Sequence, residues 1–163
     1  MALATAHPAL PDAVALGPGA VLDLLAHCVA DRVGYRLMTI LVPAPDGRLL
    51  LRIFSSNLRQ YPLGDADIVE DTVWFRQLFG ACEPVIANDA AEIAAWLPGF
   101  DTYAEQGYGS LANVPVVVAG RTVGILSLMA DAGYFTPERL AALREELPMA
   151  ALAILAEGRT AAA

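Results

Sequence analysis

Few side chains in this 163-residue chain could carry out catalysis, and they are scattered. The chain has two cysteines, Cys28 and Cys82, and two histidines, His7 and His27. Nucleophilic catalysis by serine or cysteine needs a histidine beside the nucleophile. On a helix, His27 would point about 100° away from its neighbour Cys28. Histidines, cysteines and carboxylates form no cluster with metal-ligand spacing. The sequence therefore predicts no catalytic residue, no metal site and no cofactor.

A second group of residues is suited to binding a small polar molecule. Ser127 is the one hydroxyl in the apolar segment 125–129, so it needs a partner if it points inward, and a neighbouring carbonyl would also serve. The run Ser55, Ser56 and Asn57 ends a strand-like segment and can either contact a ligand or form a turn. These residues make a binding site the leading chemical interpretation.

Arginine and aromatic residues near these segments have two interpretations each. Arg52, close to Ser56, could hold an anionic ligand through charge-assisted hydrogen bonds, although a solvated face or a surface ion pair is favoured for it and for Arg36. Tyr61 and Trp74 could close a pocket or pack as ordinary core residues, and core packing is favoured for Trp74.

Composition argues against nucleic acid and membrane as partners. The ten basic residues are all arginine and are dispersed, and 18 carboxylates leave a net charge of −8, whereas phosphate binding needs clustered positive charge. The apolar fraction is 56%, but the longest uncharged apolar stretches are about half the roughly twenty residues of a spanning helix. Residues 1–18 lack the charged region of a secretory signal and are expected to form a flexible leader, which predicts a cytoplasmic protein.

Hydrophobic periodicity predicts the elements that position these residues. Two strand-like runs flank the turn at 43–47, and two more flank the turn at 119–120, which is typical of hairpins. Two hairpins and a short strand between terminal helices predict an α+β domain with a central antiparallel sheet of about five to six strands. The predicted helices cover 21–33, 69–80, 90–97 and 138–157, and the predicted strands cover 35–42, 48–55, 83–87, 111–118 and 121–129.

Local signals refine this outline. Asp89, followed three residues later by Glu92, predicts a helix cap. Pro115 lies within a predicted strand and predicts a bulge or a weakly paired edge. The last helix carries apolar residues at spacings of 3, 4, 3 and 4, a heptad-like seam that predicts packing against a second copy. The seam consists of Leu140, Leu143, Leu147, Ala150 and Ile154.

The order of elements and several motifs resemble a GAF domain, a small-molecule sensor fold, over about residues 19–157. The most specific motif is Asn113-Val-Pro-Val116 followed by Gly120-Arg-Thr-Val-Gly-Ile-Leu-Ser-Leu128, which is typical of the last two GAF strands. The segments 34–42 and 134–137 fit the first strand and the start of the last helix. The resemblance predicts one domain over 19–158, after a flexible leader at 1–18 and before a disordered tail at 159–163.

The resemblance also implies where function lies. In GAF domains the terminal helices, here 21–33 and 138–157, pack on one face of the sheet and often form a homodimer interface. The other face holds the ligand under loops and short helices. The implied pocket residues mix aromatic rings with hydroxyl and amide groups, which suits a small polar ligand. They are Phe54, Ser55, Ser56, Asn57, Tyr61, Trp74, Asn88, Tyr108, Ser110, Asn113 and Ser127.

The implied function is a sensor that binds an unidentified small molecule without a covalent bond and signals through its terminal helices, with a separate effector protein as a possible partner. One alternative is a redox enzyme resembling the free methionine sulfoxide reductase of this fold, which uses cysteines in its pocket loops. Those loops, here 55–67 and 87–110, hold no cysteine, so this alternative rests on Cys82. The other alternative is a structural dimerisation module with a self-filled pocket.

Overall fold

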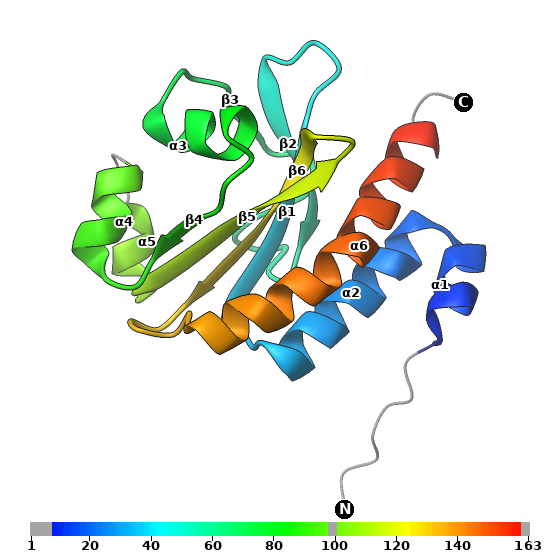
Figure 1. The fold of residues 1–163 in the computed structure, drawn as a ribbon, viewed down its shortest axis with the longest axis horizontal. Helices are drawn as coiled ribbons and strands as arrows, with labels where there is room; N and C mark the ends of the chain where they lie inside the picture. Colours follow the sequence, from blue (N-terminus) through cyan, green and yellow to red (C-terminus); the bar gives the residue numbers. More distant parts are fainter. Residues whose placement is uncertain (1–7, 98–100, 161–163) are drawn as a thin grey trace, which may run out of the picture.

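A six-stranded antiparallel sheet in the order β3-β2-β1-β6-β5-β4 forms the centre of the molecule (Figure 1). The computed structural model describes residues 8–97 and 101–160. The predicted α+β class and both predicted hairpins, β1 with β2 and β5 with β6, are confirmed. The strands are β1 Leu37–Pro43, β2 Leu49–Ser55, β3 Ala66–Ile68, β4 Val85–Ala87, β5 Ser110–Val118 and β6 Arg121–Ala130. The helices are α1 Leu10–Leu16, α2 Pro18–Arg32, α3 Val73–Phe75, α4 Ala90–Trp96, α5 Asp101–Glu105 and α6 Pro137–Thr160, with a π-helical turn η1 at Arg76–Gly80.

The two faces of the sheet are covered by different sets of helices. The long helices α2 and α6 lie side by side on one face, and the short elements α3, α4 and α5 lie on the other side of the molecule (Figure 1). The face under α2 and α6 is apolar: Met38, Ile40, Leu126 and Leu128 are fully or almost fully buried there together with Leu25. This arrangement leaves the second face to be closed by loops and short helices.

The seam of the last helix has a different partner from the one expected. Leu143, Ala150 and Ile154 are buried within the chain itself, in the same apolar cluster as α2 and the sheet. Beside this cluster, Arg32 of α2 forms ion pairs with the exposed Glu145 and the buried Glu146 of α6. The seam therefore serves the domain core, and the expectation that it packs against a second copy is wrong for these residues.

Three segments differ from the sequence prediction. The leader expected to be flexible contains α1, because Ala13 is fully buried against its neighbours and Pro11 suits a first helical turn. The helix expected over 69–80 begins at Val73, because the Thr72 hydroxyl accepts a hydrogen bond from the Phe75 amide at 3.1 Å and caps it there. The third difference is that β3 and α5 are not among the predicted strands and helices.

Two irregularities shape the hairpins. In the first hairpin Ile40 pairs with Phe54 while Leu41 pairs with Arg52, so Ile53 is an extra residue in β2. In the second hairpin the register shifts between Val116 and Val117, close to the proline that predicted a bulge there. The first bulge matters for function, because it changes which β2 side chains face each side of the sheet.

A helix that crosses a membrane needs about twenty predominantly apolar residues. Within the described ranges 8–97 and 101–160, no helix combines this length with this apolar character, and this includes the 24-residue α6.

A glycine allows α6 to approach the sheet closely. A Cβ atom at Gly124 of β6 would lie 2.7 Å from Ile154 Cδ1 and 2.9 Å from the Leu41 carbonyl oxygen. We expect Gly124→Ala to lower the free energy of unfolding by about 1 to 3 kcal/mol, because the backbone atom cannot move aside cheaply. Urea unfolding followed by circular dichroism measures this change.

The same substitution at Gly158 is the matched control. A Cβ atom there meets no atom within 4 Å, and glycine in a helix costs up to about 1 kcal/mol relative to alanine. Gly158→Ala should therefore leave stability unchanged or raise it. A Gly124→Ala protein as stable as Gly158→Ala would show that α6 does not need this close approach.

Candidate functional site

A row of polar residues crosses the middle of the sheet on the face opposite α2 and α6. Thr39 of β1 pairs with Ser127 of β6, which pairs in turn with Asn113 of β5. Directly opposed residues share a face of the sheet, so the three side chains lie in line. All three are buried, and the Ser127 hydroxyl donates to Asn113 Oδ1 at 2.6 Å. A neutral polar row, with a hydrogen bond between Ser127 and Asn113, thus lies where an apolar core would be expected.

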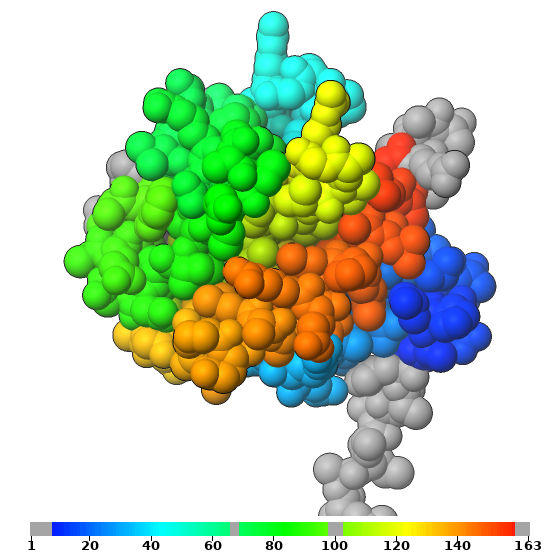
Figure 2. All heavy atoms as spheres, in the orientation of Figure 1, coloured from blue at the N-terminus to red at the C-terminus, as the bar shows by residue number. Residues whose placement is uncertain are grey.

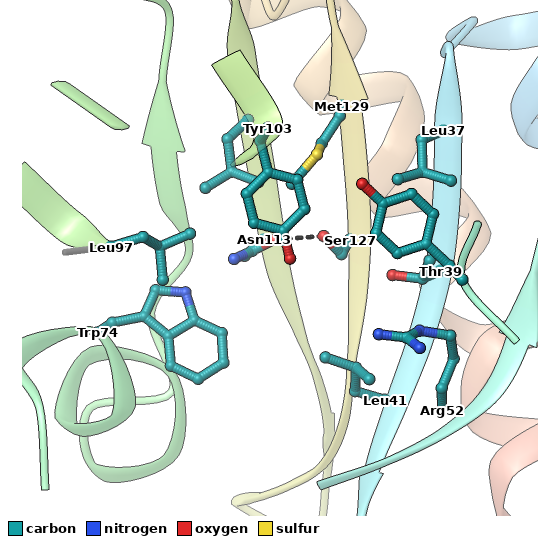
Figure 3. Close-up of a pocket in the computed structure, with 12 residues that line it drawn as sticks. Leu37, Thr39, Leu41, Arg52, Trp74, Leu97, Tyr103, Asn113, Ser127 and Met129 are labelled. Carbon is teal, nitrogen blue, oxygen red and sulfur yellow. Dashed lines mark hydrogen bonds between the residues drawn. The ribbon is translucent and has the colours of Figure 1, made fainter. Parts of the chain in front are cut away.

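This polar row divides the apolar packing of its face into two clusters. The first includes Leu37, Leu111 and Met129, and the second includes Leu41 and Ile125. Between them lies a cavity of ≈ 90 Å³, shown in Figure 3. Its lining residues are Leu37, Thr39, Leu41, Arg52, Tyr61, Trp74, Leu97, Tyr103, Leu111, Asn113, Ser127 and Met129.

Arg52 is the one charged residue of the lining. Its side chain is 7% exposed, because the bulge in β2 turns it toward the cavity face opposite Leu41. Nη1 donates to Asp65 Oδ2 at 2.9 Å and to the Pro62 carbonyl at 3.2 Å, and the guanidinium lies 5.5 Å from the centre of the Tyr61 ring. Of the two favoured interpretations of Arg52, the solvated face is therefore wrong, whereas an ion pair is present, with Asp65 of the loop 62–65 that holds the side chain in place.

Aromatic rings close two sides of the cavity. The Tyr61 and Tyr103 rings are stacked with centroids 6.1 Å apart, and the Tyr61 hydroxyl donates to Gln106 Oε1. Burial raises the pKa of Tyr61 to about 12, so its phenol stays protonated at physiological pH. Trp74 lies on the other side of the Asn113 and Ser127 pair from Arg52 (Figure 3). Its indole Nε1 is buried and has no hydrogen-bond partner among the described residues.

Four of the predicted pocket residues line the cavity, namely Tyr61, Trp74, Asn113 and Ser127. They come from a loop, from α3 and from the two long strands, and the sheet register brings them together. The Ser127 hydroxyl donates to the amide oxygen of the Asn113 side chain and not to a backbone carbonyl, so the partner that its burial requires is present. Their role in binding stays a prediction.

Phe54 and Asn88 lie elsewhere. Phe54 pairs with Ile40 and packs against the apolar cluster under α2 and α6, on the far side of the sheet from the cavity. Asn88 bonds to both backbone groups of Phe135, at 3.0 Å and 3.1 Å, and so fixes the loop before α6. Neither residue lines this cavity, because strand parity directs the Phe54 side chain to the other face and the bonds to Phe135 hold the Asn88 side chain.

The serine run after β2 forms a turn. The Ser55 hydroxyl accepts from the Asn57 amide at 3.1 Å, and Asn57 Oδ1 accepts from the Gln60 amide at 3.3 Å. The Ser56 hydroxyl accepts from the Met38 amide at 2.9 Å. Ser55 and Asn57 therefore form the turn that one interpretation predicted, and Ser56 bonds to β1, with all three residues outside the cavity lining.

The last two predicted residues are buried and lie outside the cavity lining. Tyr108 packs in the cluster of Leu37 and Met129, and the Arg36 guanidinium lies 5.1 Å from its ring centre. Ser110, at the start of β5, is fully buried, and its hydroxyl has no partner among the described residues. Tyr108 therefore supports the cavity wall, whereas Ser110 pairs with Ala130 and lies on the face of the sheet under α2 and α6.

Sequence reasoning did not place Thr39 in the site. Thr39 is the one hydroxyl in the strand Leu37–Pro43, which is the same signal that singled out Ser127. The argument applied to Ser127 in β6 would also have identified Thr39 in β1, since an isolated polar residue in any apolar strand needs a partner.

The two cysteines are both away from the cavity. Cys82 follows η1 with a φ of 56°, and its Sγ lies 3.8 Å from the Gly120 carbonyl oxygen. Cys28 lies on α2, where burial and the nearby Glu146 and Asp31 raise the pKa of its thiol. Across residues 8–97 and 101–160, no group of three histidines, cysteines or carboxylates could hold a metal ion. The cavity therefore offers binding contacts and no thiol.

Comparison with protein families matches residues 15–154 to the GAF domain. No curated protein matches the chain. Solved structures are similar over most of its length. The GAF domain/HD domain protein from Geobacter sulfurreducens is 13% identical with a TM-score of 0.70, covering 85% of this chain and 92% of that one. The GAF-B domain of DevS from Mycobacterium smegmatis is 21% identical with a TM-score of 0.62, covering 90% and 99%. At these identities the structures show a shared fold alone.

Substitutions in the polar row test how much its hydrogen bond contributes to the free energy of unfolding. Ser127→Ala should lower the free energy of unfolding by about 1 to 3 kcal/mol, because it leaves the buried Asn113 Oδ1 without a donor. Adding Asn113→Leu should recover most of that loss, since two apolar groups of similar size can replace a buried hydrogen-bonded pair. Urea unfolding of both variants measures the difference. A double variant less stable than Ser127→Ala would show that the row is needed for folding.

Proposed function

Because this chain belongs to the GAF domain family, we propose that it is a sensor that binds a small polar molecule non-covalently in the cavity between its two apolar clusters. Domains of this family are small-molecule sensory and regulatory modules. The observation that carries the proposal is the row of Thr39, Ser127 and Asn113 beside that cavity. An apolar core would pack more simply there, so a polar row with open space beside it favours a ligand.

The chemistry of the lining supports binding over catalysis. None of its twelve residues is a histidine, cysteine, aspartate or glutamate, the usual acids, bases and nucleophiles. Its hydroxyl pair, Thr39 and Ser127, has no adjacent base to activate it. A redox role for Cys82 would require a second site outside this cavity. We therefore propose a non-enzymatic role.

We further propose that the domain forms a homodimer through its terminal helices and signals to a separate effector protein through them. Leu152 and Leu155 of α6 are 38% and 47% exposed, and Val14 and Leu16 of α1 are exposed as well. Figure 2 shows the outer surface of α6 next to α1, in orange to red and in blue. Exposed leucines on a long helix favour an interaction surface, because they gain most from burial.

Native mass spectrometry of freshly purified protein tests the binding proposal. We expect a bound small molecule on the wild type that is absent from the Ser127→Ala/Asn113→Leu variant, because that variant removes the polar contacts while keeping side-chain volume. In a Trp96→Phe background, adding the released molecule should change the fluorescence of the remaining tryptophan, Trp74, which lines the cavity. A wild type that carries no molecule and binds none from a metabolite extract would favour the structural dimerisation module.

Sedimentation of charged variants tests the homodimer. Leu152→Glu/Leu155→Glu should shift the protein to a monomer, because two carboxylates would have to be desolvated in the interface. Leu58→Glu is the matched control: Leu58 is also an exposed leucine, at 58%, but lies in the loop after β2. A wild type that sediments as a monomer at high concentration would contradict the homodimer.

A further inference from the structure

Two buried hydrogen-bond donors of the cavity lining have no acceptor among the described residues. Arg52 Nε and Trp74 Nε1 are both buried and without a partner among the described residues. Arginine and tryptophan side chains can only donate hydrogen bonds, so neither of these two groups can serve as the acceptor for the other. Asn113 accepts through Oδ1 from Ser127, which leaves its Nδ2 as a further donor on the same wall. The missing partner must therefore be rich in acceptor oxygens.

Arg52 presents a defined edge to that partner. Both of its side-chain hydrogen bonds, to Asp65 and Pro62, use Nη1. The N–H groups of Nε and Nη2 point the same way from the planar guanidinium, at a spacing that matches the two oxygens of a carboxylate. Figure 3 shows this guanidinium reaching over the sheet toward Thr39. The unpartnered Nε belongs to the edge that carboxylates bind in pairs of hydrogen bonds.

The charge balance favours an anion over a neutral acceptor. The lining holds one cation and no carboxylate. The counter-ion of Arg52, Asp65, is 56% exposed, so water screens its charge, whereas Arg52 is buried. A carboxylate placed inside would interact with the guanidinium at lower dielectric than Asp65 does.

The volume limits the size of that anion. At ≈ 90 Å³ the cavity is well below the roughly 300 Å³ at which pockets for drug-sized ligands begin. The rest of the lining is apolar, with Leu37, Leu41 and Met129 among its residues. A carbon chain of a few atoms fits these walls, and a polyphosphate or a nucleotide does not.

We propose, resting on the ligand-binding function above, that the cavity binds a short carboxylic acid of two to four carbons that carries a second acceptor oxygen. Its carboxylate lies on the Nε edge of Arg52, its carbon chain lies against the apolar walls, and its hydroxyl or oxo oxygen accepts from Trp74 Nε1 or Asn113 Nδ2. No bond is made or broken in this binding.

Isothermal titration with paired probes tests this proposal. Lactate, pyruvate, glycolate and 2-oxobutyrate are each compared with the corresponding primary amide, which keeps the size and removes the charge. We expect at least one acid to bind tenfold or more tightly than its amide. Arg52→Met should remove that preference, while Trp74→Phe should weaken the acid several-fold and keep the preference. Inorganic phosphate should not compete.

Arg36→Met is the matched control for Arg52→Met. Arg36 is also paired with an aspartate, bonded to a backbone carbonyl and placed over a tyrosine ring, but it lies outside the cavity lining. This variant should bind the acid as the wild type does. Circular dichroism and unfolding of both variants establish that each is folded before titration.

The outcomes separate this inference from the function on which it rests. If every amide binds as well as its acid, or if the preference survives in folded Arg52→Met, the carboxylate assignment is overturned. If no acid binds while native mass spectrometry shows a neutral or cationic molecule in the cavity, the sensor function stands and the ligand class is wrong. If no probe binds and no molecule is carried, both fail.

Discussion

The register of β1, β6 and β5 is the constraint on which the rest of the structure depends. It sets Thr39, Ser127 and Asn113 opposite one another on one face of the sheet and their apolar neighbours on the other. A slip of one residue would turn every side chain of a strand to the opposite face and bury the polar row under α2 and α6. The apolar core under those helices therefore specifies the site, because it tolerates one register only.

Because of the same register, residues that face the cavity and residues that face the terminal helices are sequence neighbours on one strand. On β6, Ser127 faces the cavity, while Leu126 and Leu128 pack in the cluster shared with α2 and α6. Successive strand residues are about 3.4 Å apart, so a displacement of Ser127 would also displace the residues that support the helices. Gly124 on the same strand lets α6 lie close enough to respond. One strand thus connects the cavity of the proposed sensor with the helices that we propose to signal.

Hydrophobic pattern and turn chemistry were sufficient to predict most of the fold. Both hairpins, the two long helices and the helix capped by Asp89 follow from apolar spacing and short polar connections. The pattern could not predict α1, because an Ala- and Pro-rich segment becomes helical when tertiary packing buries Ala13. It could not predict β3 either, since a three-residue edge strand has no period of its own and depends on pairing with β2.

A site residue was predictable where its type alone required a partner, as with Ser127. It was unpredictable where the direction of its side chain depended on which face of the sheet its strand position faced. One extra residue, Ile53, puts Arg52 and Ser55 on the cavity face and Phe54 on the other, a distribution that strict alternation does not allow. That bulge brings a buried cation into a chain whose net charge is −8. At long range such a chain repels anions. The attraction between Arg52 and an anion therefore acts only over a short distance. For the proposed ligand, this favours a small singly charged molecule over a polyanion.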